Sequence, residues 1–376
     1  DWLVGMNATR AATIRARSAF GGVVSLGRVQ TPTLGILATR EREIAEFVPE
    51  TYFLVTADFE TPDGSGRTWQ GMWFDHEKPA GDNRSNWLAS TEAAQAVLDR
   101  VISSSGTVEQ LEIKKQNERP ALLYDLTSLQ REANGRFGFS AKTTLSLAQN
   151  LYERHKALTY PRTDSRHLPE DYLATVKDTM QMLAKSGMGH LAPFAKTAIA
   201  EGYLKPTKKV FDNAKVSDHF AIIPTLEAPS GLSEAEQKLY DFVVRRFIAA
   251  FFPPAQFLDT TRISQVSANG KTHHFKSTGR VLIEPGWQAI YGKEVDDDED
   301  KESGKILVKL TAGEQPRVQN AEPKALKTRP PARYTEATLL SAMEGAGKLV
   351  DDEELAEAMR DSGLGTPATR AQTIED

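Results

Sequence analysis

One short segment, Leu158 to Ser165, holds residue types that could act together on a phosphodiester. Tyr160 supplies a hydroxyl group, which is a poor nucleophile at neutral pH because a phenol has an unperturbed pKa of about 10. Arg162 supplies a planar guanidinium that can donate two hydrogen bonds to phosphoryl oxygens and neutralise their charge. Attack by the hydroxyl would give a phosphotyrosine ester, which keeps the free energy of the broken bond and makes the break reversible without ATP. The alternative is a tyrosine that only packs on a loop.

The residues around Tyr160 favour the catalytic interpretation. Residues 158–169, LTYPRTDSRHLP, resemble the active-site segment of type IA DNA topoisomerases, and the proline after the tyrosine is similar to the topoisomerase III branch. Five further segments resemble signatures of the same family, in the family's order. They are SLGRVQTPTLG at 25–35, SAKTTLSLAQNLYE at 140–153, DHFAIIPT at 218–225, ARYTEATLL at 332–340 and GLGTPATRA at 363–371. We therefore expect a member of this family.

Length and composition indicate a soluble globular protein. The chain has 376 residues, enough for two or three domains, with 40% hydrophobic and 26% charged residues. No apolar run approaches the roughly 20 residues of a membrane span, so association with a membrane is not expected. There is no cysteine, which excludes disulfides and cysteine-ligated zinc ribbons. The chain opens on Asp1-Trp2-Leu3 without an initiator methionine or a signal peptide, so we expect a fragment.

The formal net charge of −5 argues weakly against a nucleic-acid partner, but positive charge is concentrated locally. Residues 1–40 hold five arginines and one aspartate, and residues 119–166 hold eight basic and four acidic residues, so each segment has a net charge of +4. Six acidic residues in Asp296–Glu302 provide compensating charge and are interpreted as a solvated loop. A locally basic surface is compatible with DNA binding because the local field matters more than the total.

Hydrophobic periodicity predicts two β-rich stretches around a helical middle. Helices are predicted over residues 1–18 and from Thr31, as N-cap, with Pro32 in the first turn, towards Ile44. The loop before the second helix and the exposed amides at the helix start are predicted to bind a phosphate. The alternative is an ordinary capped helix without a ligand. Strands are predicted at 52–60, 68–74, 107–115, 258–266, 273–277 and 306–310, and a helix at 91–102. This order predicts an insertion into a β domain.

The middle of the chain, residues 119–252, is predicted to be mostly helical. Helices at 127–137 and 141–155, with Ser140 as N-cap of the second, suggest a helix-turn-helix or winged-helix arrangement, or an ordinary αα-hairpin. Near the end of the chain, helices are predicted at 337–343 and 352–359, followed by a third that Thr366 caps and Pro367 opens. Neither GFSAKT at 138–143 nor GAGK at 345–348 has the glycine spacing of a nucleotide-triphosphate loop.

The resemblance implies an α+β multidomain fold in which four domains surround a hole large enough for duplex DNA. Two helical, winged-helix-like (CAP-like) domains and a β-rich arch are expected here: residues 1–48 with 326–376 as the single-strand-binding domain, 49–118 with 256–325 as the arch, and 119–255 as the tyrosine domain. The family's Toprim domain would precede Asp1 and is expected to be absent. Mg²⁺ is expected in the intact enzyme through that domain, and no cofactor is expected on this chain.

The same resemblance assigns the site residues. Tyr160 would attack the scissile phosphate and become joined to the 5′ phosphate, Arg162 would stabilise that phosphate, and His219 would donate to it or help move a proton; some members have a second histidine where Phe220 stands. Contacts to single-stranded DNA are expected from Ser25, Leu26, Gly27, Arg28, Val29, Gln30, Thr9, Arg10, Arg17, Arg333, Thr335, Thr369 and Arg370.

The resemblance also implies a monomer that binds single-stranded DNA in the cytoplasm, in association with the nucleoid. Two alternatives remain open: a single-strand-binding clamp with an unused tyrosine, and a tyrosine recombinase, which makes the opposite 3′ linkage. The intact TYPRTDS argues against the first alternative, and the mid-chain position of Tyr160 argues against the second.

Overall fold

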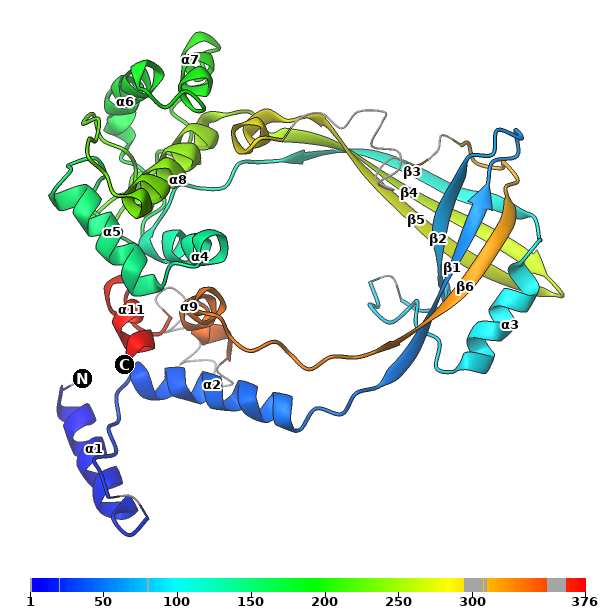
Figure 1. Cartoon of the computed structure of the whole chain (residues 1–376), viewed down its shortest axis with the longest axis horizontal. Coiled ribbons are helices and arrows are strands. Elements are labelled where there is room, and N and C mark those ends of the chain that lie inside the picture. Colours follow the sequence, from blue (N-terminus) through cyan, green and yellow to red (C-terminus); the bar gives the residue numbers. More distant parts are fainter. Residues whose placement is uncertain (1, 20, 80, 294–306, 308–309, 350–362) are drawn as a thin grey trace. The chain divides into compact units, whose positions relative to one another are not determined.

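The computed structural model describes the chain apart from residues 1, 20, 80, 294–306, 308–309 and 350–362 (Figure 1). The chain divides into two compact units. Unit 1 comprises Asp1–Glu46, Pro120–Phe252 and Pro331–Asp376, and unit 2 comprises Phe47–Arg119 and Pro253–Pro330. Unit 1 is helical and unit 2 is built on a sheet, which confirms the predicted α+β class. The further division of unit 1 into two helical domains stays a prediction.

Unit 2 contains one six-stranded antiparallel sheet in the order β3-β4-β5-β2-β1-β6. Its elements are β1 (Thr51–Glu60), β2 (Thr68–Phe74), α3 (Thr91–Val101), β3 (Gly106–Glu118), β4 (Ala255–Ala268), β5 (Lys271–Glu284) and β6 (Arg317–Lys327). Alternate residues of β1, namely Val55, Ala57 and Phe59, are fully buried. This period of two turns one face of the sheet towards a core, against which α3 packs (Figure 1).

A glycine in β2 allows the aromatic part of this core to close. A Cβ atom on Gly71 would lie 2.9 Å from Cε2 of Phe59 and 3.0 Å from Cβ of Phe275. The rings of Phe59 and Phe275 meet edge to face with centroids 5.5 Å apart. A larger residue at position 71 would force these rings apart, since close-packed cores tolerate little added volume.

The structure confirms the predicted strands β1 to β5 and helix α3, but β6 was not predicted. Only Val318 and Ala321 of β6 are buried, so its sequence lacks a clear alternation of apolar residues. The strand also contains Pro323, which is tolerated because β6 lies at an edge of the sheet. The strand predicted at 306–310 falls mostly outside the described residues, as does the acidic loop at 296–302.

Unit 1 contains the remaining helices. They are α1 (Trp2–Ala16), α2 (Gln30–Ala45), α4 (Leu126–Phe137), α5 (Ala141–Glu153), α6 (Leu173–Lys185), α7 (Ala192–Ala200), α8 (Glu234–Phe251), α9 (Glu336–Glu344) and α11 (Pro367–Glu375). The longest of these, α8, begins with a capping box between Ser233 and Glu236 and buries most of its length, including Val243 and Phe247. The helix predicted at 352–359 lies outside the described residues.

Three helix starts test the predicted caps. Ser140 caps α5 by accepting a hydrogen bond from the Thr143 amide at 3.0 Å, as predicted. Thr366 is the N-cap of α11, and its amide donates to Oγ1 of Thr369 at 2.9 Å, which confirms that prediction. The prediction for Thr31 was wrong. Helix α2 already begins at Gln30, and Oγ1 of Thr31 instead turns back to accept from the Gly27 amide at 3.0 Å.

The middle segment of unit 1, residues 120–252, is covalently connected to the other two segments only by way of unit 2. Direct contact between them is therefore non-covalent. Arg131 of α4 pairs with Glu344 of α9 at 3.0 Å, and the amide of Ala141 donates to Oε2 of Glu336 at 2.6 Å. A small apolar cluster of Ala141, Leu340 and Ala371 completes the junction.

Candidate active site and nucleic-acid interface

The segment that carries Tyr160 is held against a second segment, residues 210–225, by backbone and hydroxyl hydrogen bonds. Thr159 is the main anchor on one side of the tyrosine. Its amide donates to the carbonyl of Ile223 at 3.0 Å, its hydroxyl donates to the carbonyl of Ala221 at 2.9 Å, and the same hydroxyl accepts from the Ile223 amide at 2.9 Å. These bonds fix the backbone immediately before Tyr160.

On the other side of Tyr160, two buried hydroxyls also anchor the active-site segment to residues 210–225. Thr163 donates to the carbonyl of His219 at 3.1 Å, and Ser165 donates to the carbonyl of Lys215 at 2.8 Å. The small polar residues after the tyrosine therefore bind the backbone that carries His219. Because buried polar groups must be paired, this arrangement fixes the register of the two segments.

The hydrogen bonds bring the predicted histidine onto the predicted nucleophile. The rings of Tyr160 and His219 lie 4.3 Å apart between centroids and are tilted by 44°. On its other side, Tyr160 meets the edge of Tyr152 of α5 at 5.4 Å and 78°. Tyr160 is half-buried and His219 is exposed, and none of the described residues forms a hydrogen bond with the Tyr160 hydroxyl. The phenol is thus fixed by its ring, while its oxygen has no partner in the described part of the protein.

Arg162 is exposed and is oriented by a residue that the sequence analysis missed. When the Gln149 side chain is turned so that its amide oxygen faces Arg162, this oxygen accepts from Nη2 at 2.8 Å and from Nε at 3.1 Å. Gln149 precedes Tyr152 by three residues on α5, so both side chains lie on the same helix face. That spacing, inside one of the family-like segments, was the available signal. Phe220, in turn, packs on Tyr172, with ring centroids 4.8 Å apart.

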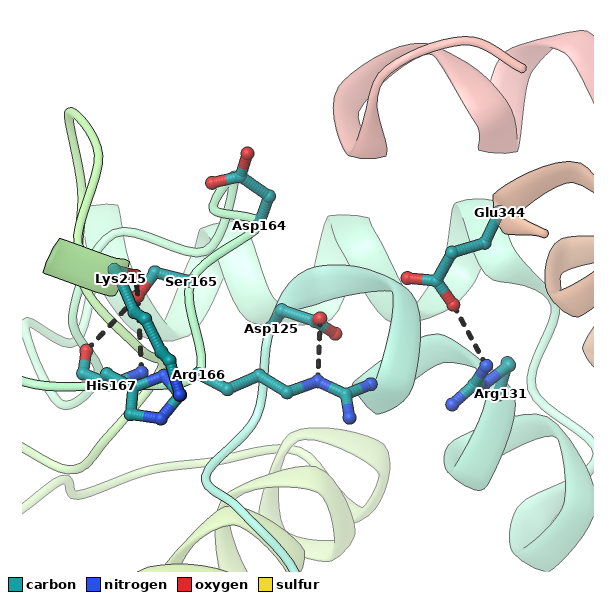
Figure 2. Close-up of a pocket in the computed structure, with 8 residues that line it drawn as sticks. All are labelled: Asp125, Arg131, Asp164, Ser165, Arg166, His167, Lys215 and Glu344. Atoms are coloured by element: carbon teal, nitrogen blue, oxygen red, sulfur yellow. Dashed lines mark hydrogen bonds and ion pairs between the residues drawn. The ribbon is translucent and has the colours of Figure 1, made fainter. Parts of the chain in front are cut away.

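A polar cavity of about 410 Å³ lies beside the active-site segment (Figure 2). It is lined by Asp125, Arg131, Asp164, Ser165, Arg166, His167, Lys215 and Glu344. Nε of Arg166 donates to Asp125 at 2.8 Å, and Asp125 also accepts from the Ser128 amide at the start of α4. His167 is buried, and burial lowers the pKa of its imidazole below the usual value. The positive charges of Lys215 and Arg166 lower this pKa further, and Asp212 partly opposes them.

The predicted DNA contacts near the N-terminus gather on α1, the loop after it and the start of α2. Thr9 connects them, because its hydroxyl accepts from the Leu26 amide at 3.0 Å and donates to the Leu26 carbonyl at 3.3 Å. The side chains of Arg10, Arg17, Ser25, Arg28 and Gln30 are exposed, whereas Leu26, Gly27 and Val29 are half-buried. The loop thus presents polar and cationic groups on a backbone that Thr9 fixes.

A groove of about 1080 Å³ adjoins the same loop. It brings Arg28 and Val29 together with Thr369 from the far end of the chain. Tyr334 also lines it, and the Arg40 guanidinium lies 4.3 Å from the centre of that ring. Arg40 and Tyr334 were not predicted as site residues. An aromatic ring beside arginines offers a stacking surface for a base.

Three predicted contacts have structural partners. Arg333 is exposed and forms a two-pronged ion pair with Glu41, at 2.8 and 2.9 Å, and the Thr335 hydroxyl caps α9. The prediction for Arg370 needs correction, because only 3% of this residue is exposed. Its guanidinium donates to the Leu364 carbonyl and to the Thr127 hydroxyl, both at 3.0 Å. Arg370 therefore stabilises the junction of α11 with α4 rather than offering a surface charge.

Among the described residues, no group of three or more His, Asp or Glu side chains is arranged to hold a metal ion. No helix in the described ranges is long and apolar enough to cross a membrane.

Comparison with known proteins identifies the class. A family profile described as DNA topoisomerase matches residues 1–376, and the chain therefore belongs to the DNA topoisomerase family. Within it the chain is of type IA and resembles topoisomerase III. It is 41% identical over 382 residues to DNA topoisomerase 3 of Bacillus licheniformis, and 40% identical over 384 residues to DNA topoisomerase 3 of Bacillus subtilis. Each match covers 100% of this chain and 49% of the relative, so the chain spans about half the length of these proteins.

A solved structure agrees with the predicted architecture. Full-length topoisomerase I from Thermotoga maritima matches 99% of this chain and 54% of its own, with a TM-score of 0.67. At 24% sequence identity this match shows the fold. It confirms the predicted type IA topoisomerase core.

Proposed function

We propose that this chain is the part of a type IA DNA topoisomerase that carries the nucleophile. The Tyr160 hydroxyl oxygen would attack a backbone phosphorus of single-stranded DNA, forming a phosphotyrosine bond and breaking the bond from phosphorus to the 3′ oxygen. The phenolic proton leaves and the 3′ oxygen takes up a proton, so the break is chemically balanced and reversible. The observation that carries this proposal is the packing of the Tyr160 ring on His219 beside Arg162.

Arg162 would neutralise charge that develops on the phosphoryl oxygens. With the Gln149 amide turned so that its oxygen faces Arg162, the fork donates two hydrogen bonds to that oxygen, which orients the guanidinium before DNA binds. A donor fixed in advance stabilises a transition state more effectively than a flexible one, because little reorganisation accompanies the reaction. A phosphate would meet the donors of Arg162 that Gln149 leaves available.

His219 would act on the proton or on the phosphate. Its ring is exposed and in contact with the nucleophile's ring, while its backbone carbonyl accepts from Thr163. An imidazole can donate to a phosphoryl oxygen or transfer a proton to the departing 3′ oxygen. Both roles require the ring to lie next to the tyrosine, where the paired segments hold it.

Single-stranded DNA would reach this site from the loop between α1 and α2. Exposed Arg10, Arg17 and Arg28 supply positive charge there, and the adjoining groove offers Tyr334 as a stacking surface. Phosphate contacts of this kind give binding that weakens steeply as the salt concentration rises. The contact with bases would be largely independent of sequence, because every base has a face that can stack.

Strand passage requires the two sides of the break to separate. The non-covalent junction of α4 and α5 with α9 and α11 supports this step, because the covalent path between the two sides runs through unit 2. We further propose that the intact enzyme uses Mg²⁺ in a part other than the residues described here. It would act as a monomer in the bacterial cytoplasm, at the nucleoid.

The test is relaxation of negatively supercoiled plasmid, without ATP, by a full-length enzyme. We expect relaxation by the wild type and none by Tyr160→Phe. We also expect the 376-residue chain alone to bind single-stranded DNA and to fail to relax plasmid. Relaxation by the full-length Tyr160→Phe variant would overturn the assignment of the nucleophile, and binding of single-stranded DNA without relaxation by the full-length wild type would favour the clamp alternative.

A further inference from the structure

We propose that the cavity beside the active-site segment binds a second backbone phosphate of the DNA strand, a few nucleotides from the phosphate that Tyr160 attacks. We name it the His167 pocket, with the lining residues given above. The inference rests on the proposed function, since it concerns the same strand. It assigns to His167, Lys215 and Arg166 a binding role that the family-like motifs did not predict.

His167 is the first observation. Only 6% of this residue is exposed, yet no hydrogen bond joins its ring nitrogens to any described residue. Its backbone is fully engaged, because its amide donates to the Ser165 hydroxyl at 3.2 Å and its carbonyl accepts from the Ala221 amide at 3.0 Å. The ring nitrogens are not among the fully buried side-chain atoms that lack a partner, so they are accessible from the cavity that the ring lines, where a ligand would replace water as their hydrogen-bond partner.

The charges around the ring indicate an anion. Figure 2 shows the Lys215 side chain beside the His167 ring, and Arg166 extending from the neighbouring position towards Asp125. The carboxylates of the pocket already have partners: Asp125 binds Arg166, Asp164 accepts from the Ser217 hydroxyl at 2.9 Å, and Glu344 binds Arg131. Lys215 has only a distant carboxylate, Asp212, at 3.9 Å. The groups most available to a ligand are therefore an ammonium and an imidazole.

The balance of charge also identifies the source of the anion. Three basic side chains and three carboxylates line the pocket, so its formal charge is zero when His167 is neutral. Such a pocket attracts free phosphate only weakly. A phosphate carried by a strand that is already bound elsewhere arrives at a high effective concentration and can occupy it. A backbone phosphate is therefore favoured over an inorganic one.

The position of the pocket sets the distance along the strand. Ser165 follows Tyr160 by five residues, and an extended chain advances at most about 3.3–3.6 Å per residue, so the pocket wall begins within roughly 18 Å of the nucleophile. A single strand that occupies both positions would place a phosphate in the pocket only a few nucleotides from the scissile bond. The effect should therefore be confined to one position or two adjacent positions on the DNA.

Replacement of single phosphates by uncharged methylphosphonates tests this. With a full-length enzyme and a strand whose cleavage site is mapped, each replacement near that site is tested for its effect on the yield of covalent adduct. In the wild type we expect a loss of roughly tenfold at the position that fills the pocket, the size of one hydrogen bond to a charged group. Lys215→Ala and His167→Leu should remove the sensitivity at that position alone. Lys185→Ala, at an exposed lysine of α6, is the matched control and should keep it.

Nuclear magnetic resonance of the histidine rings gives a readout that does not depend on cleavage. In the Tyr160→Phe background, a bound oligonucleotide should move the titration of His167 to higher pH, because a phosphate stabilises the imidazolium form. The same concentration of inorganic phosphate should move it much less. An unchanged His167 titration with bound oligonucleotide would overturn the proposal, and an equal shift with inorganic phosphate would assign the pocket to free anions instead. Failure of the wild type to form any adduct, with the His167 shift present, would count against the proposed function and not against the pocket.

Discussion

The ring of His219 lies 4.3 Å from the ring of Tyr160, although the two residues belong to separate sequence motifs. Threonine side chains on either side of Tyr160 hold the two segments together and so place the rings in contact. Thr159 and Thr163 bind the carbonyls of Ala221 and His219 on either side. The geometry of the site is therefore a property of the paired segments, and substitutions in either segment should alter it.

Thr159→Val should destabilise unit 1 and misplace His219. Valine has nearly the same shape but leaves the Ala221 carbonyl and the Ile223 amide without their partner, which costs about 1–3 kcal/mol of unfolding free energy. Urea denaturation measures this, and adduct yield in a full-length enzyme should fall as well. Thr197→Val, at an exposed threonine of α7, is the control. Equal unfolding free energies of the two variants would contradict the role of Thr159 as an anchor of the active-site segment.

Arg162→Lys should reduce strand cleavage while leaving stability unchanged. An ammonium group cannot reproduce the planar fork that Gln149 orients. Removing one preorganised donor typically lowers the rate by about 10²–10³-fold, and lysine should recover only part of that loss. Single-turnover cleavage by a full-length enzyme measures the effect. Gln149→Ala should have a smaller effect in the same direction, and an Arg162→Lys enzyme with wild-type cleavage would refute the role of the guanidinium.

Arg28→Ala and Arg370→Ala should have different consequences. Arg28 is exposed on the loop before α2, so its loss should weaken binding of single-stranded DNA for all sequences. The slope of the logarithm of the binding constant against the logarithm of the salt concentration should become shallower by about one. Arg370 is buried and binds Leu364 and Thr127, so its loss should lower the unfolding free energy by roughly 2–3 kcal/mol. Anisotropy across a salt series and thermal unfolding separate the two. The reverse pattern would mean that the surface assignment is wrong.

The buried His167 should make stability depend on pH. Its folded-state pKa is lowered by burial and by Lys215, so the folded protein binds this proton more weakly than the unfolded chain does. The stabilising contribution is complete above the unfolded-state pKa of 6.5 and is lost as the pH falls below that value. Urea midpoints between pH 7.5 and pH 5 should fall, and His167→Gln should fall less steeply. Parallel curves for the two proteins would contradict this prediction.

The sequence predicted most of the regular structure because the signals are local. Strand β1 has a clear alternation of buried residues, and the Ser140 and Thr366 caps follow from short-range hydrogen bonding. The exceptions involve competing local partners or weak patterns. The Thr31 hydroxyl accepts from the Gly27 amide instead of capping α2, and β6 lacks a clear apolar alternation because only Val318 and Ala321 of the strand are buried. Neither outcome is visible in periodicity.

The residues of the site also fall into two groups: those that a sequence motif identifies and those whose contacts depend on tertiary packing. The resemblance named Tyr160, Arg162 and His219, which the structure brings together, but a motif gives no information about the neighbours of each side chain. Gln149 and Tyr152 meet the active-site segment only because α5 packs beside it. The burial of Arg370 likewise depends on the packing of α11 against α4. Such contacts between distant segments require the tertiary structure.

The most direct test of the central claim is the polarity of the covalent DNA linkage in a full-length enzyme. A single strand is labelled at either its 5′ or its 3′ end, cleavage is stopped with denaturant, and the modified peptide is identified by mass spectrometry. We predict that the fragment with the 3′ label stays attached to protein through Tyr160, that the fragment with the 5′ label is released with a free 3′ hydroxyl, and that Tyr160→Phe yields no adduct although it still binds DNA. Retention of the 5′ label, or an adduct on any residue other than Tyr160, would contradict the account.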